Sequence, residues 1–121
     1  FRSCRRYSIP VFAGALTPSE IMRAWETGAD VIKVFPANVF GPRYLHDLQG
    51  PFPQVRLMPT GGVAVHNVGE YLRAGAFAVC AGGSLVSPSA VRQRNWPEIT
   101  ARAKEFVAAV KATRQVSSDK V

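Results

Sequence analysis

The sequence predicts an α/β fold in which parallel strands alternate with helices. Short apolar runs begin near Ile9, Val31, Val55 and Ala78, at intervals of 22, 24 and 23 residues. Each run ends in glycine or proline and precedes a segment with helix-like character. Alternation of strand and helix at this interval is typical of a parallel sheet with helices packed outside it. We therefore expect about four βα units in the 121-residue chain.

The segments between the runs carry start and stop signals for helices. The stretch TPSE at 17–20 combines a capping box with proline at the first helical position, and Gly28 is placed to end that helix. A short helix is expected over 43–49, and another from Asn67 to Gly75. A last helix is predicted over 96–113, with one apolar face formed by Ile99, Ala103, Phe106, Val107 and Val110.

Two architectures compete, the open doubly wound sheet and the closed barrel. The open sheet is expected to carry Gly-x-Gly-x-x-Gly after its first strand, and the sequence at 13–16 is AGAL instead. Glycine pairs follow the third and fourth runs, as Gly61-Gly62 and Gly82-Gly83. In barrels, loops after neighbouring strands supply backbone N–H groups to a phosphate. The sequence therefore favours a (β/α)8 TIM barrel, of which four units are half.

Composition and charge narrow the classes of function. No apolar run approaches the length of a membrane span, so no membrane association is expected. Cys4 and Cys80 fit no metal or redox spacing, and a reduced, cytoplasmic setting is the expectation. The formal charge is +7, but only Arg2, Arg5 and Arg6 cluster, and no aromatic residues interleave with a basic run. We therefore expect no nucleic-acid partner, and the basic surface suits an anionic small-molecule substrate.

The stretch DVIKVFPA at 30–37 places a lysine inside an apolar strand. Alternation puts Val31, Lys33 and Phe35 on one face, with Lys33 near the C-terminal end of the strand, where barrel enzymes carry their chemistry. An amine enclosed there loses solvation, and its neutral form attacks a ketone to give an imine. From the pattern alone, a lysine on an exposed edge strand or one paired with a carboxylate is an equally good interpretation.

The loops PTGGV at 59–63 and AGGS at 81–84 are both predicted to bind phosphate, and Ser84 would add a hydroxyl donor to the second. Each loop taken singly is also explained as a tight turn that requires glycine for its backbone angles. Two such loops on successive strands, beside a lysine at a strand end, favour an anion site.

The remaining polar candidates are predicted to be structural. His46 and His66 lie in different units without neighbouring ligands, so no metal site is expected. Glutamates at the third position of helices are explained by capping, and they are Glu20, Glu70 and Glu98.

These motifs, in this order and at this spacing, resemble the second half of the class I aldolases that cleave 2-keto-3-deoxy-6-phosphogluconate (KDPG). Relatives acting on the phosphogalactonate epimer and on 4-hydroxy-2-oxoglutarate (KHG) share the motifs. The segments GALTPSE at 14–20 and FGPRYLHDLQGPFP at 40–53 fit the family's linking segments, so the resemblance covers roughly residues 9–88. The K-x-F-P-A block is its specific part. The fold implied is the C-terminal half of a (β/α)8 TIM barrel.

The resemblance implies a role for each motif. Lys33 would be the Schiff-base residue, which attacks the C2 ketone so that the C3–C4 bond breaks and pyruvate and glyceraldehyde 3-phosphate are released. No metal or organic cofactor is implied, and the full-length enzyme would be a homotrimer. The implied substrate-binding residues are Phe35, Pro36, Thr60, Gly61, Gly62, Gly82, Gly83 and Ser84, of which the last five match the family's phosphate-binding loops.

The same resemblance implies how the chain is divided into segments, and it implies that part of the active site lies on strands that would precede Phe1. Residues 1–8 are expected to end a preceding helix, 9–95 to form four βα units, 96–113 a C-terminal helix and 114–121 a flexible tail. The family's acid/base glutamate, and the arginine and threonine that hold the substrate carboxylate, lie on early strands that would precede Phe1. Ala13 stands where relatives usually carry proline.

Other functions remain open from the sequence. One is another pyruvate lyase or an epimerase among the phosphate-binding barrels. A second is a non-catalytic half-barrel that binds a phosphorylated metabolite through its glycine loops and forms no imine. A nucleic-acid-binding module is the third and least favoured.

Overall fold

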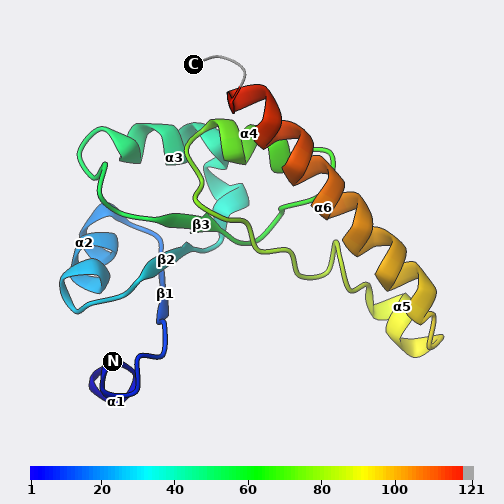
Figure 1. The fold of residues 1–121 in the computed structure, drawn as a ribbon, viewed down its shortest axis with the longest axis horizontal. Coiled ribbons are helices and arrows are strands. Elements are labelled where there is room, and N and C mark those ends of the chain that lie inside the picture. Colours follow the sequence, from blue (N-terminus) through cyan, green and yellow to red (C-terminus); the bar gives the residue numbers. More distant parts are fainter. Residues whose placement is uncertain (119–121) are drawn as a thin grey trace.

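The computed structural model describes residues 1–118, in which helices and strands alternate along much of the chain (Figure 1). The elements in chain order are α1 (Arg2–Arg6), β1 (Phe12–Ala15), α2 (Pro18–Glu26), β2 (Val31–Val34), the 3₁₀ helix η1 (Ala37–Val39), α3 (Gly41–Gln49), β3 (Leu57–Pro59), α4 (Val68–Arg73), α5 (Pro88–Arg92) and α6 (Trp96–Ser118). None of the described helices is long and apolar enough to cross a membrane.

The strands of the described chain form one parallel sheet in the order β1-β2-β3. Ile32 and Val34 of β2 are fully buried, on the face of the sheet that the helices cover. Lys33 lies between them in sequence and on the opposite face, in register with Gly14 of β1 and Met58 of β3. The predicted alternation along this strand is therefore confirmed at the position of the lysine.

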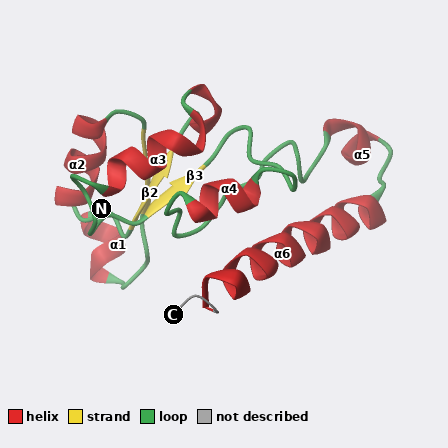
Figure 2. Cartoon of the chain, turned by 90° about the horizontal axis from the view of Figure 1, so that it is seen from above, coloured by secondary structure: helices red, strands yellow, loops and turns green. Residues whose placement is uncertain are grey.

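The hydrophobic core lies between the sheet and the helices, and Figure 2 shows α6 running alongside α4 at one side of it. Tyr44 of α3 donates a hydrogen bond of 2.5 Å to the carbonyl of Leu16, which ties α3 to the end of β1. The core thereby fixes the strand ends relative to one another. Its fully or nearly fully buried members include Ile21, Ile32, Val34, Leu45, Leu48, Leu57, Val68, Tyr71 and Phe106.

The predicted start and stop of α2 are confirmed. The Thr17 hydroxyl accepts a hydrogen bond from the backbone N–H of Glu20, and the Glu20 carboxylate accepts one of 2.8 Å from the N–H of Thr17. Gly28 follows the helix with φ of +99°, a conformation that favours glycine. Hydrogen bonds from the backbone of Thr17 and Leu16 hold the pKa of Glu20 below its usual value.

The first and fourth apolar runs differ from their predicted form. Ile9 belongs to the turn after α1, where its N–H donates to the carbonyl of Cys4, so β1 begins only at Phe12. The fourth run follows β3 in parallel but makes a single bridge, between Thr60 and Cys80, and is no full strand. Pro59 of β3 faces this run with its carbonyl but has no backbone N–H to donate to it, which limits the pairing.

The C-terminal region is more helical than predicted. α5 was not anticipated, although Ser87 begins it as a side-chain cap and Pro88 occupies its first position, as Thr17 and Pro18 do in α2. α6 continues to Ser118, so the expected tail is helical from Arg114 to Ser118. The helix has no glycine or proline to end it at the predicted place. Residues 119–121 of the expected tail lie outside the described residues.

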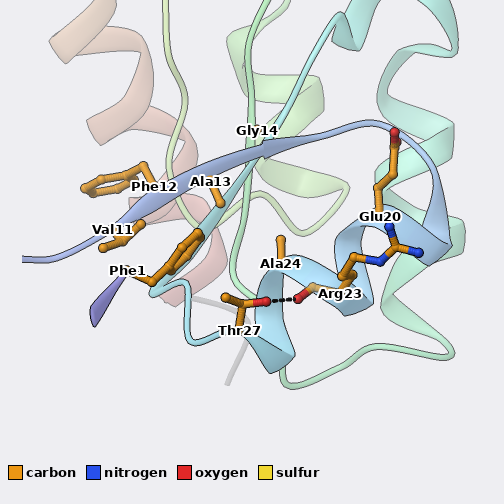
Figure 3. A pocket seen from close by; sticks show the side chains of 9 residues that line it. All are labelled: Phe1, Val11, Phe12, Ala13, Gly14, Glu20, Arg23, Ala24 and Thr27. Atoms are coloured by element: carbon orange, nitrogen blue, oxygen red, sulfur yellow. Dashed lines mark hydrogen bonds between the residues drawn. The ribbon is translucent and has the colours of Figure 1, made fainter. Parts of the chain in front are cut away.

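The sheet is open along β1. Within the described chain this strand pairs only with β2, and Phe12 is 55% exposed. Figure 3 shows the hollow of about 500 Å³ beside it, which β1, α2 and the start of the chain enclose. Its lining consists of Phe1, Val11, Phe12, Ala13, Gly14, Glu20, Arg23, Ala24 and Thr27. The described residues thus form an arc of a barrel rather than a closed one.

Candidate active site

Lys33 projects from β2 on the sheet face opposite the core. Its side chain is half-buried, and its Nζ atom lies 5.4 Å from the centroid of the Phe35 ring. The other described lysines, Lys104 and Lys111, are exposed on α6. Lys33 is therefore the one amine among the described side chains that lies on the sheet, close to the C-terminal strand ends.

A cavity of about 510 Å³ lies at those strand ends, next to Phe35. It contains seven of the eight predicted substrate-binding residues, since all of them except Pro36 line it. Pro36 packs behind it, because a Cβ placed on Gly61 would lie 3.5 Å from the Pro36 Cα. The full lining is Phe35, Thr60, Gly61, Gly62, Val63, Ala64, Gly82, Gly83 and Ser84. The two glycine loops, 21 residues apart at Val63 and Ser84, thus meet at one cavity.

The cavity wall offers backbone donors and no charge. None of the lining residues is ionisable. Within residues 1–118, the N–H groups of Gly62, Val63, Gly83 and Ser84 donate no hydrogen bond to another protein atom. Free backbone N–H groups on two loops are the arrangement that binds phosphate in many proteins. The geometry therefore suits an anion that these groups surround.

The first loop is held by Asn67, a role that the sequence analysis missed. Asn67 precedes α4 as predicted, but its side chain makes no cap to that helix. Its Oδ1 accepts from the N–H of Ala64 at 2.8 Å, and its Nδ2 donates to the carbonyl of Gly62 at 2.9 Å. The asparagine at a helix start was the available signal, and it supports the loop instead of the helix.

The hydroxyl of Ser84 bonds to the protein itself and is not offered to the cavity. The Oγ atom donates to the carbonyl of Val63 at 2.5 Å, which joins the second loop to the first. A hydroxyl has one proton to donate, so Ser84 offers the cavity its backbone N–H while its side chain fixes the spacing of the loops. The predicted role as hydroxyl donor is therefore not the one seen in this structure.

Thr60 contributes a buried polar atom to the same wall. The residue is 8% exposed, and among the described residues its Oγ1 has no hydrogen-bond partner. Its backbone is firmly held, since its N–H donates to Val34 and its carbonyl accepts from Ala37. An unpaired buried hydroxyl costs free energy, which a ligand would recover by bonding to it.

No described group of three or more His, Cys, Asp or Glu side chains could hold a metal ion. His46 lies 3.4 Å from the carboxylate of Asp47 on α3, and His66 is exposed in the turn before α4. The cavity is lined by glycine loops, apolar side chains and Thr60, and Lys33 lies outside this lining, with its Nζ 5.4 Å from the centroid of the Phe35 ring that borders the cavity.

A parallel βα sheet with an amine and two glycine loops near the carboxyl ends of its strands is typical of half of a (β/α)8 barrel. Comparison with known proteins specifies the family. Residues 1–102 match the model of the KDPG and KHG aldolases, and the chain belongs to this family.

The chain is similar over most of its length to curated members of that family. It is 39% identical over 99 residues to the 2-dehydro-3-deoxy-phosphogluconate aldolase of Pseudomonas aeruginosa, covering 80% of this chain and 44% of that protein. The corresponding enzyme of Haemophilus influenzae is 32% identical over 109 residues, covering 89% of this chain and 51% of the relative. The chain therefore spans about half the length of the curated relatives it matches.

Solved structures give the same result for the fold. The KDPG aldolase of Legionella pneumophila, with pyruvate captured as a covalent carbinolamine, superposes with a TM-score of 0.74 at 31% identity. The match covers 88% of this chain and 51% of that one. A structure described as native KDPGal gives a TM-score of 0.80 at 27% identity, covering 94% of this chain and 54% of that one.

Proposed function

We propose that this chain supplies the Schiff-base half of a class I aldolase that cleaves KDPG to pyruvate and glyceraldehyde 3-phosphate. The observation that carries the proposal is the placement of Lys33 near the carboxyl end of β2, with its Nζ 5.4 Å from the ring of Phe35, which lines the cavity of the two glycine loops. An amine at that place attacks the keto acid while the loops hold the phosphate at the far end of the same substrate.

The chemistry begins when the neutral Nζ of Lys33 adds to the C2 ketone and forms a carbinolamine. Loss of water gives an iminium, which accepts the electron pair of the C3–C4 bond as that bond breaks. The hydroxyl on C4 loses its proton and becomes the aldehyde of glyceraldehyde 3-phosphate. The enamine left on Lys33 takes a proton at C3, and water then hydrolyses the imine to release pyruvate. The pyruvate carbinolamine captured in the Legionella pneumophila relative supports this course, since a carbinolamine requires an amine nucleophile.

The phosphate is assigned to the free N–H groups of the two glycine loops. The match of these loops to the family's phosphate-binding loops supports the assignment, as does the lack of protein acceptors for the N–H groups of Gly62, Val63, Gly83 and Ser84. Thr60 and Phe35 line the same cavity, and the Phe35 ring also lies near Lys33, so we expect both residues to contact the keto-acid portion. Proton transfer needs a further group, because none of the residues that line the cavity is a carboxylic acid.

The oligomer, the compartment and the exact substrate rest on the resemblance. A homotrimer in the cytoplasm, working without metal or organic cofactor, remains our prediction. The phosphogalactonate epimer and KHG are the alternative substrates, and a relative from Escherichia coli named KHG/KDPG aldolase is 39% identical over 106 residues. KHG carries a carboxylate where KDPG carries its phosphate end, so the phosphate cradle favours KDPG.

The test is an aldolase assay on this chain mixed with the half of the Pseudomonas aeruginosa enzyme that it does not match. Pyruvate release from KDPG, the phosphogalactonate epimer and KHG is followed with lactate dehydrogenase. We expect the greatest kcat/KM for KDPG and at least a ~10³-fold loss with Lys33→Arg, since a guanidinium stays protonated and cannot form the imine. Phosphate binding without turnover of any of the three would instead identify a non-catalytic half-barrel.

A further inference from the structure

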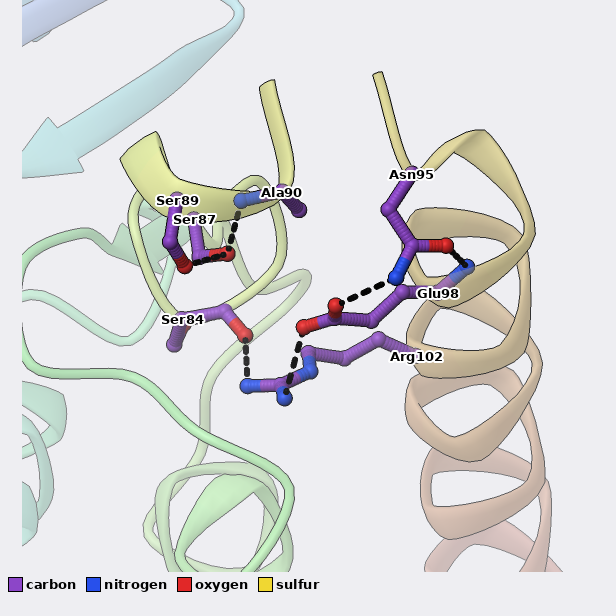
Figure 4. Close-up of polar contacts among 7 residues, drawn as sticks. All are labelled: Ser84, Ser87, Ser89, Ala90, Asn95, Glu98 and Arg102. Atoms are coloured by element: carbon purple, nitrogen blue, oxygen red, sulfur yellow. Dashed lines mark hydrogen bonds and ion pairs between the residues drawn. The ribbon is translucent and has the colours of Figure 1, made fainter. Parts of the chain in front are cut away.

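A polar network connects the start of α6 to Ser84 of the second glycine loop (Figure 4), and the hydroxyl of Ser84 extends it to the first loop. The Asn95 side chain accepts from the N–H of Glu98 at 3.2 Å and donates to its carboxylate at 3.0 Å. The other carboxylate oxygen of Glu98 lies 3.6 Å from a terminal nitrogen of Arg102. The second terminal nitrogen of Arg102 donates to the carbonyl of Ser84 at 3.2 Å, and the Ser84 hydroxyl donates to Val63.

Arg102 connects α6 to the second glycine loop, which is otherwise held by bonds to the Gly82 carbonyl and by the Ser84 hydroxyl. α6 is a 23-residue helix that packs against α4, so its side chains have a fixed origin. In the second loop, the backbone bonds of Leu85 and Val86 both end on the carbonyl of Gly82. A Cβ added to Gly83 would meet no atom within 4 Å, so the loop is open on that side. The planar guanidinium reaches this loop and Glu98 simultaneously.

We propose that Arg102 is a positioning residue for the phosphate site, which sets the orientation of the Gly83 and Ser84 N–H groups by holding the Ser84 carbonyl. The proposal rests on the phosphate site proposed above. The Ser84 carbonyl belongs to the peptide unit that directly follows the Gly83 and Ser84 N–H groups, so holding it restricts the backbone angles of Ser84 and, through them, the directions of those N–H groups. The backbone donors are thus oriented before an anion arrives, which reduces the entropy lost on binding.

Arg102 acts through the loop and not as a direct ligand of the phosphate. It does not line the cavity, and its two terminal nitrogens are engaged by Ser84 and Glu98. The ion pair with Glu98 also offsets part of the charge of Arg102. We therefore expect Arg102 to affect anion binding more through the position of the loop than through its electrostatic field. In the sequence it is one of many scattered arginines, which is why the pattern did not single it out.

Titration of the 121-residue chain with inorganic phosphate, followed by ¹H–¹⁵N NMR at the amides of 82–85, tests the proposal. Arg102→Met keeps the aliphatic stem and removes the guanidinium, and we expect the Kd to rise about five- to tenfold. Lys104→Met is the matched control, because it removes one positive charge from an exposed site on the same helix. Its Kd should change by less than about twofold.

Two further variants distinguish a positioning role of Arg102 from a purely electrostatic one. Glu98→Gln removes a negative charge near the loop, so a purely electrostatic role of Arg102 would make phosphate bind more tightly. If Arg102 positions the loop, Glu98→Gln should instead raise the Kd for phosphate about twofold or more, because Arg102 loses the carboxylate that holds it. Arg102→Lys should give an intermediate Kd, since one ammonium cannot span both partners as the fork does.

The outcomes distinguish this inference from the proposed function. If the unaltered chain binds phosphate but Arg102→Met and Lys104→Met have equal Kd values, or if Glu98→Gln tightens binding, the positioning role is overturned and the phosphate site stands. If the unaltered chain shows no phosphate-dependent shifts at residues 61–63 and 82–85, both proposals fail together. A normal NMR spectrum away from the loop confirms in each case that the variant is folded.

Discussion

At the scale of single residues, the loop glycines differ in why they must be glycine. Gly62 has φ of +71°, and a Cβ there would lie 2.5 Å from the Cβ of Asn38. Gly83 has no atom within 4 Å of such a Cβ and does not have a positive φ. Gly62 is therefore required by the fold, whereas Gly83 is unrestricted by the protein around it.

We expect Gly83→Ala to leave the free energy of unfolding within about 0.5 kcal/mol of the original value and to weaken phosphate binding, because its methyl group enters the space of the anion. Gly62→Ala should lower the free energy of unfolding by at least about 1 kcal/mol with or without phosphate, from backbone strain alone. Urea unfolding and a phosphate titration measure the two effects. Unchanged phosphate affinity of Gly83→Ala would show that the second loop is only a turn.

A second residue-scale prediction concerns pH. The folded-state pKa of Glu20 lies below 4.5, because the backbone N–H groups of Thr17 and Leu16 bond its ionised form. Its contribution is therefore present above about pH 4.5 and is lost as the pH falls through the lowered folded-state value. Glu20→Gln should lower the Tm at neutral pH, and the difference from the original chain should shrink on acidification. A Tm difference that is constant down to the acid limit would show that the charge is irrelevant.

The sequence predicted the positions of single residues better than it predicted their hydrogen-bond partners. The position of Lys33 followed from alternation within an apolar strand, and the meeting of the two loops followed from their places after successive runs. The side-chain directions of Asn67 and Ser84 did not follow. Asn67 bonds to the carbonyl of Gly62, and Ser84 bonds to the carbonyl of Val63. The positions of these two carbonyls are fixed only once the whole sheet has formed.

At the scale of elements, only part of the apolar face predicted for α6 is buried in the structure. The predicted face contained Phe106 and Val107, but Phe106 is 7% exposed and Val107 is 53% exposed. We expect Phe106→Ala to cost about 3–5 kcal/mol of unfolding free energy through the cavity it leaves. Val107→Ala is the neighbouring control and should cost less than about 0.5 kcal/mol. Similar losses from both, measured by urea unfolding, would mean that α6 packs with a different face.

The boundaries of α2 followed from local signals, whereas the extents of the strands did not. The capping box and Gly28 gave the limits of α2 because those interactions lie within a few residues of each other. A strand exists only with a neighbour, so its length depends on pairing that sequence does not display. The fourth apolar run accordingly proved to be an extended segment with one bridge to Thr60.

At the scale of the whole molecule, the open edge of β1 predicts association. Unpaired strand edges and exposed apolar side chains promote pairing with other chains, and Phe12 stands at this edge beside the hollow of Figure 3. We expect the 121-residue chain to self-associate as its concentration rises in sedimentation velocity. Phe12→Lys should shift it toward the monomer, and Val91→Lys on exposed α5 should not. A concentration-independent monomer of the unaltered chain would contradict this view of the edge.

The central claim is that Lys33 forms an imine with a keto acid, and borohydride trapping tests it most directly. This chain, mixed with the half of the Pseudomonas aeruginosa relative that it does not match, is incubated with pyruvate and reduced with borohydride. Peptide mass spectrometry then locates the adduct. We predict one reduced pyruvyl group, on the peptide that contains Lys33, and none with Lys33→Arg. Labelling at Lys104 or Lys111 instead, or no labelling of this chain at all, would contradict the account.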